Sequence, residues 1–176
     1  MSIKKQILKN NIVLVTEPIA TSKTVAIGFW FSVGSRYEAE NQSGITHFVE
    51  HMIFKGTPNR RAYEIACSFD RIGGYVNAFT ERELVCLHCV VPAQYAEFAL
   101  EILTDMTHNA LFLEQDVNKE RSVIESEIIS AQDDPEEACL DTVIDCVFPE
   151  NPLSKNICGT LETVKNLSPT DLKNWY

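Results

Sequence analysis

Short runs of apolar and β-branched residues in the first half of the chain predict strands. Residues 6–8 and 12–16 flank a polar stretch that contains two asparagines, which is the pattern of a β-hairpin. Residues 24–33 form a longer run that is rich in valine, isoleucine and aromatic residues. Two further runs, at residues 75–80 and 84–91, predict two more strands.

Helical periodicity occupies most of the remaining chain. Residues 44–55 follow Ser43, whose side chain is of a type that caps helices, and residues 61–72 stop at two glycines. The later predicted helices lie at residues 92–109 and 113–132, after Asp134-Pro135 and after Ser168-Pro169. Because strands and helices come in separate groups, the order predicts an α+β fold with an antiparallel sheet covered by helices on one face.

The length of the chain, 176 residues, is enough for one domain with a sizeable core. The last predicted helix has barely begun when the chain ends in two aromatic residues, Trp175 and Tyr176. Residues 1–176 are therefore expected to form one domain that is truncated at its C-terminus.

The charge of the chain excludes some classes of partner. Lysine and arginine number 15 against 25 acidic residues, which gives a net charge of −10. Neither nucleic acid nor an anionic membrane surface is expected as a partner. The lysines at the N-terminus precede only a short apolar run at residues 12–15, so no secretory signal is expected. We expect a cytoplasmic protein, or a mitochondrial matrix protein if the source is eukaryotic.

The six cysteines, without an export signal, are expected to be reduced thiols. Cys86 and Cys89 form a C-x-x-C sequence, but they lie within a predicted strand. Residues three apart on a strand point to opposite faces, so the pair predicts buried structural thiols rather than a metal site.

The most informative segment is the H-x-x-E-H sequence in the first predicted helix. His47 and His51 are four residues apart, about 40° around a helix, so both project from one face. Two imidazoles placed in this way can bind one Zn²⁺ ion, and Glu50 lies within reach as a base for hydrolysis. A histidine pair of this spacing is often only structural, but H-x-x-E-H is the inverted form of a zinc peptidase motif.

A catalytic zinc site needs a third protein ligand, and residues 120–128 offer candidates. Glu120 and Glu127 are seven residues apart, within about 20° on one helix face, at the border of an apolar stripe. Glu125 lies about 160° from Glu127 and belongs to the solvent side. A glutamate pair at such a border is also typical of a solvated rim, and spacing alone does not choose between the two.

Four segments together resemble the pitrilysin/insulinase family of zinc peptidases, and most of all its branch of mitochondrial processing peptidase β-subunits and bacterial relatives. Residues 47–57 read HFVEHMIFKGT, and residues 73–83 read GGYVNAFTERE. Residues 120–128 read ERSVIESEI, and residues 32–36 contain a G-S-R turn. The resemblance extends over almost the whole chain.

The resemblance implies a role for each matching residue. His47, His51 and Glu127 would be the ligands of one zinc ion per chain, and Glu50 would be the general base. Glu120 would not bind the zinc ion itself, but would orient one of its ligands or tune the zinc-bound water. Asn77 and Ala78, on a strand at the sheet edge, would hold the backbone of a peptide substrate. The family's active unit has two similar halves around a chamber, so a second homologous half-domain or a dimer partner is expected.

The expected function is therefore that of a zinc metalloendopeptidase acting on peptides or presequences. Two alternatives remain: a structural subunit that has lost catalysis, and a zinc-stabilised domain that captures peptides without cutting them. The first is disfavoured because all four key positions are intact, and the second because a purely structural zinc site has no use for Glu50 as a base. The acidic run from residue 133 to 137 indicates a preference for basic peptides, or alternatively only a solvated face and a helix cap.

Overall fold

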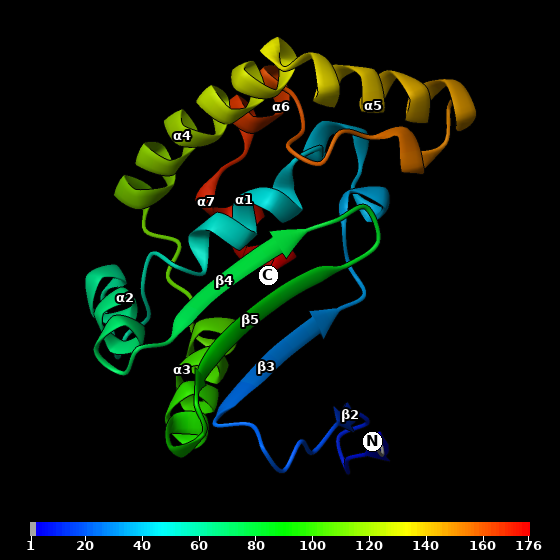
Figure 1. Ribbon diagram of the computed structural model, residues 1–176. Coiled ribbons are helices and arrows are strands. Elements are labelled where there is room, and N and C mark those ends of the chain that lie inside the picture. Colours follow the sequence, from blue (N-terminus) through cyan, green and yellow to red (C-terminus); the bar gives the residue numbers. More distant parts are fainter. Residues whose placement is uncertain (1–2) are drawn as a thin grey trace.

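The computed structural model describes residues 3–176, whose chain begins with a β-hairpin (Figure 1). Strands β1 (Lys4–Ile7) and β2 (Val13–Thr16) are antiparallel and form a two-stranded sheet of their own. Asn11 has a φ of 65° in the connecting turn, and the Asn10 side chain accepts the N–H of Ile12. The predicted hairpin is confirmed, as a sheet separate from the other strands.

The central sheet has three antiparallel strands, in the order β3-β5-β4. They are β3 (Thr24–Phe31), β5 (Val85–Pro92) and β4 (Tyr75–Thr80). In the register, Gly28 and Asn77 lie on either side of His88. Strand β4 is therefore an edge strand, with one row of backbone groups unpaired within the sheet.

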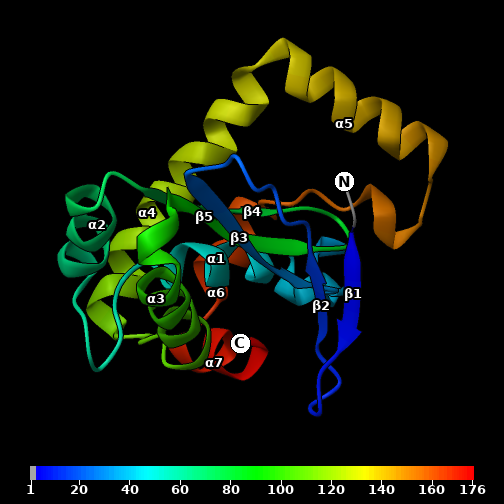
Figure 2. The ribbon, with the colours of Figure 1, turned by 60° about the horizontal axis from the view of Figure 1, so that its bottom comes forward.

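Helices cover one face of this sheet, as the sequence predicts (Figures 1 and 2). The helix bounds are α1 (Ile45–Met52), α2 (Ala62–Arg71), α3 (Ala96–His108), α4 (Glu114–Asp133), α5 (Pro135–Val147), α6 (Leu161–Asn166) and α7 (Pro169–Trp175). A first core cluster joins the sheet to α2 and α3, with Ile65, Phe69, Leu87 and Ile102 almost fully buried. A second cluster joins α1 to α4, α6 and α7. Helix α5 extends away from the rest of the molecule (Figure 2).

Most helix ends agree with the predicted ones, but neither end of α1 does: it stops at Met52, whereas the prediction extended to residue 55. Ser43 was expected as its cap, whereas the N-cap is Gly44, with a φ of 90° and no side-chain cap of its own. Helix α3 begins later than predicted, because residues 93–95 form a 3₁₀ turn first. The short helix α6 was not predicted; a capping box between Thr160 and Thr163 starts it.

The cysteines of the described chain are reduced, as the sequence predicts. All six cysteines are free thiols, and Cys86 and Cys89 are buried. Burial raises the pKa of both thiols, so they stay protonated and inert. Among the described helices, none is both long and apolar enough to cross a bilayer.

Gly44 combines a strained backbone with a close approach between two chain segments. A Cβ at this position would lie 2.5 Å from the carbonyl oxygen of Cys158, whereas a Cβ at Gly73, with a φ of 68°, would meet no atom within 4 Å. We expect Gly73→Ala to lower the free energy of unfolding by about 1–2 kcal/mol, from the left-handed backbone alone.

For Gly44→Ala, we expect a loss larger by at least about 2 kcal/mol, because the backbone clash adds to the same conformational cost. Urea denaturation of the two variants and the parent measures this difference. Equal losses in the two variants would contradict the close packing of residues 44 and 158.

Candidate metal centre

Helix α1 presents two imidazoles on the side opposite its buried face. Ile45, Phe48 and Met52 are fully buried on that face, as the spacing predicts. His47 and His51 are only partly exposed, and their Nε2 atoms lie 3.2 Å apart. Because the apolar face holds the helix against the core, the two ring nitrogens are directed to one point.

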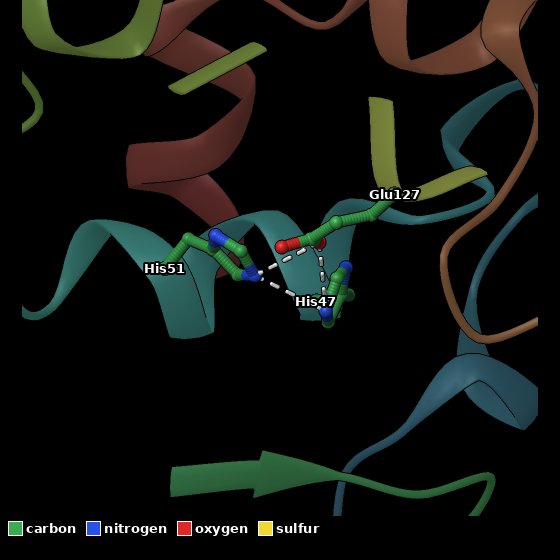
Figure 3. Close-up of side chains that lie close together, drawn as sticks. All are labelled: His47, His51 and Glu127. Carbon is green, nitrogen blue, oxygen red and sulfur yellow. Dashed lines mark hydrogen bonds and ion pairs between the residues drawn. The ribbon is translucent and has the colours of Figure 1, made fainter. Parts of the chain in front are cut away.

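Glu127 reaches the same point from α4, which packs against α1 (Figure 3). Its Oε2 atom lies 3.5 Å from His51 Nε2 and 4.0 Å from His47 Nε2. Within the described part of the chain, these three residues are the one group of His, Cys, Asp and Glu that converges closely enough to hold a metal ion.

Two of the three distances between the ligand atoms match those around a zinc ion. Bonds of about 2.0–2.1 Å at tetrahedral angles place neighbouring ligand atoms about 3.3 Å apart. The distance between the two imidazole nitrogens is 3.2 Å, and the distance from His51 Nε2 to Glu127 Oε2 is 3.5 Å. The distance from His47 Nε2 to Glu127 Oε2 is longer, at 4.0 Å. Two histidines and one carboxylate also leave one position of a tetrahedron open, which is typical of catalytic zinc sites.

Burial and neighbouring charge favour the neutral, metal-binding form of His47. Burial, helped by the proximity of His51, lowers the pKa of His47 to about 4. The ring is therefore neutral at pH 7, and a metal ion would not compete with a proton for it. Its Nδ1 atom is buried and has no hydrogen-bond partner among residues 3–176.

The second histidine is oriented by a buried carboxylate. His51 Nδ1 lies 2.8 Å from Glu120 Oε1, and Glu120 is only 7% exposed. An ionised carboxylate only accepts hydrogen bonds, so the proton lies on Nδ1 and the lone pair of Nε2 faces His47 and Glu127. Burial raises the pKa of Glu120, but hydrogen bonds and charges from Lys55 and His51 outweigh it, and the pKa lies below its usual value.

Glu50 is held beside the cluster by a hydroxyl from the sheet. Thr80 Oγ1 donates to Glu50 Oε2 at 2.6 Å. Burial raises the pKa of Glu50 above its usual value, although the Thr80 hydrogen bond and the electrostatic influence of His51 oppose the effect. A carboxylate with a raised pKa is a stronger base, which is the property that proton abstraction needs. Thr80 was not predicted, since its contact depends on how β4 packs against α1.

Glu38 is a second residue that the sequence did not reveal. Its carboxylate accepts the N–H groups of Gly44 and Thr46 at 2.8 and 2.9 Å, and it is only 2% exposed. It therefore caps the N-terminus of α1, in place of the predicted Ser43. Burial raises the pKa of Glu38, against the opposing effect of these hydrogen bonds and of Lys155.

Asn77 and Ala78 lie on the edge strand β4, where the resemblance puts them. The Asn77 side chain is on the exposed face, and its Oδ1 atom accepts the N–H of Ala78 at 2.9 Å. Ala78 is buried on the helix-covered face. The side chain of Asn77 thus occupies one of the donors along this edge.

Comparisons with known proteins show which family this chain resembles. The family described as "Insulinase (Peptidase family M16)" matches residues 13–161. An uncharacterized zinc protease of Bacillus subtilis is 39% identical over 173 residues, which cover 98% of this chain and 42% of that protein. A probable mitochondrial-processing peptidase subunit beta of Arabidopsis thaliana is 36% identical over 168 residues, covering 96% of this chain and 32% of that protein.

The fold is shared with a solved structure. A protease from Helicobacter pylori superposes with a TM-score of 0.92 at 24% identity, covering 99% of this chain and 42% of that one. The chain belongs to the insulinase family of peptidases. It spans 42% and 32% of the lengths of the two curated relatives described above.

Elemental analysis of the purified chain tests the proposed ligand set. After zinc loading and dialysis against a weak chelator, we expect about one zinc ion per chain. Glu127→Gln should lose most of it, because an amide is a poor zinc ligand. The control is Glu125→Gln, two residues earlier on the same helix and outside the cluster, which should keep the parent value. A parent chain without zinc, or equal losses in the two variants, would contradict the assignment.

Proposed function

We propose that this chain carries the catalytic zinc site of a metalloendopeptidase, with His47, His51 and Glu127 as ligands and Glu50 as the general base. The observation that supports it most strongly is the convergence of three ligand atoms beside a carboxylate whose pKa is raised. A structural zinc site needs no base, and its four coordination positions are normally all filled by protein ligands.

The chemistry divides between the metal and the chain. When bound, zinc supplies a Lewis acid that polarises the scissile carbonyl and makes a water molecule more acidic. Glu50 accepts the proton of the attacking water and then donates it to the leaving amine. Thr80 fixes one carboxylate oxygen of Glu50, and within residues 3–176 no hydrogen bond engages the other oxygen, which is free to take the proton.

A peptide substrate would bind to the edge of the sheet at β4. An extended chain can add to an unpaired strand edge through backbone hydrogen bonds. The N–H of Ala78 is one such donor, and a bound peptide would replace the Asn77 side chain there. Peptides or presequences in extended form are therefore the proposed substrates.

We further propose that a second, homologous half-domain completes the active unit. The relatives described above are more than twice as long as this chain, which leaves room for one. Such a half-domain, or a dimer partner in its place, would close a chamber over the zinc site and grip the substrate.

Replacing Glu50 separates cleavage from binding. Glu50→Gln keeps the size of the side chain and its hydrogen bond to Thr80 but cannot accept a proton. We expect turnover to fall by at least about 100-fold, with the zinc content unchanged. Hydrolysis of a quenched fluorescent peptide, assayed with the longer natural protein, measures the loss.

The control for this experiment is Glu125→Gln, which should leave turnover unchanged. Full activity of the Glu50→Gln variant would overturn the proposed base. A parent that binds zinc and the peptide but never cleaves it would favour the alternative of a non-catalytic, peptide-binding member of the fold.

The acidic character of α5 and its start bears on the substrate. Asp134 caps α5 by accepting the N–H groups of Glu136 and Glu137, so part of the acidic run serves the helix itself. Glu136 and Glu137 remain exposed. We propose that this surface, together with the net charge of −10, favours basic peptides.

Pairs of peptides that differ only by replacing arginine with glutamate on one side of the cleaved bond test this preference. We expect the basic member to have a kcat/KM at least about 5-fold higher at low ionic strength, with the ratio falling as salt is added. Equal rates at low salt would leave the acidic run as a helix cap and a solvated face.

A further inference from the structure

Lys55 lies just beyond the end of α1 and turns back toward the metal centre. Its backbone N–H bonds to the carbonyl of Met52 at 3.0 Å, which continues the helical turn for one step. Its ammonium group forms an ion pair with Glu120 Oε2, and its side chain is about one-third exposed. Neither the motif nor the resemblance gives this lysine a role.

The two oxygens of Glu120 are used by two different partners. Oε1 bonds to Nδ1 of His51 at 2.8 Å, and Oε2 is held by Lys55. The carboxylate is almost fully buried, so water has little access to either oxygen. An ion pair on one oxygen fixes the rotation of the carboxylate, and thereby the direction in which the other oxygen points.

We infer that Lys55 is a positioning residue of the metal centre, which acts through Glu120 on the ring of His51. The inference rests on the proposed zinc site. Lys55 holds Glu120, Glu120 holds the Nδ1 proton of His51, and Nε2 of His51 is thereby aimed at the position between His47 and Glu127. Partners behind a metal-binding histidine affect metal affinity by about 10–100-fold.

The position of Lys55 in the chain supports this role. His51 and Lys55 are four residues apart, so one short segment contacts both carboxylate oxygens of Glu120, which lies on α4. The ion pair therefore also joins the helix that carries the two histidines to the helix that carries Glu127. A cation elsewhere on the surface could offset the charge of Glu120, but it would not set its orientation.

Zinc affinity of the full chain, measured by competition with a chromophoric chelator, tests the inference. We expect Lys55→Met to raise the dissociation constant for zinc by at least about 10-fold. Lys55→Arg keeps a cation within reach of Oε2 and should stay within about 3-fold of the parent. Lys119→Met is the matched control, because it removes an exposed lysine next to Glu120 in sequence.

A double-mutant cycle distinguishes positioning through Glu120 from a general loss of stability. If Lys55 acts through this carboxylate, Lys55→Met should weaken zinc binding no further once Glu120 is already Gln. Thermal unfolding of the zinc-free variants should show that Lys55→Met is still folded at the temperature of the zinc assay, with a midpoint below that of Lys119→Met because the buried Glu120 carboxylate has lost its cation.

Three results would overturn the inference. They are unchanged affinity in Lys55→Met, multiplicative losses in the double variant, and failure of Lys55→Arg to restore binding. In each case the zinc-binding parent would leave the proposed function standing. A parent chain that binds no zinc would overturn both.

Discussion

Helix α1 is only eight residues long, and a helix of that length does not keep its shape alone in water. Its geometry depends on burial of one face, where Phe48 and Met52 pack against α4, α6 and α7. The buried carboxylate of Glu38 satisfies the first N–H groups of the helix. The 3.2 Å separation of the two imidazole nitrogens is a result of this packing, because the i, i+4 spacing alone leaves both rings free to rotate.

The same packing explains which features the sequence could predict. Patterns within one element were reliable: the two histidines share a face, β4 has its predicted bounds, and Asp134 caps α5. Their cause is local, since helical and strand periodicity fix which side chains face together. The α+β class and the covered sheet face followed from the order of these elements.

Features that depend on contacts between elements could not be predicted. Glu38 reaches the start of α1 across a loop that contains one 3₁₀ turn (Glu40–Gln42), and no periodicity marks it. Thr80 contacts Glu50 only because β4 packs beside α1. Lys55 contacts Glu120 only because α4 also packs beside α1. The wrong expectation for Ser43 has the same origin: a distant carboxylate occupies the place that its hydroxyl was expected to take.

The bond from Asn77 to the N–H of Ala78 has a consequence for the behaviour of the free protein. An open strand edge is a template for other chains, including further copies of the same protein, and invites aggregation. Here the strand covers one of its own donors with a neighbouring side chain. An incoming strand has to compete for the N–H of Ala78 with the Asn77 side chain, which is covalently held next to it. Weak, accidental pairing is thereby discouraged, and a partner that also makes contacts beyond the backbone is favoured.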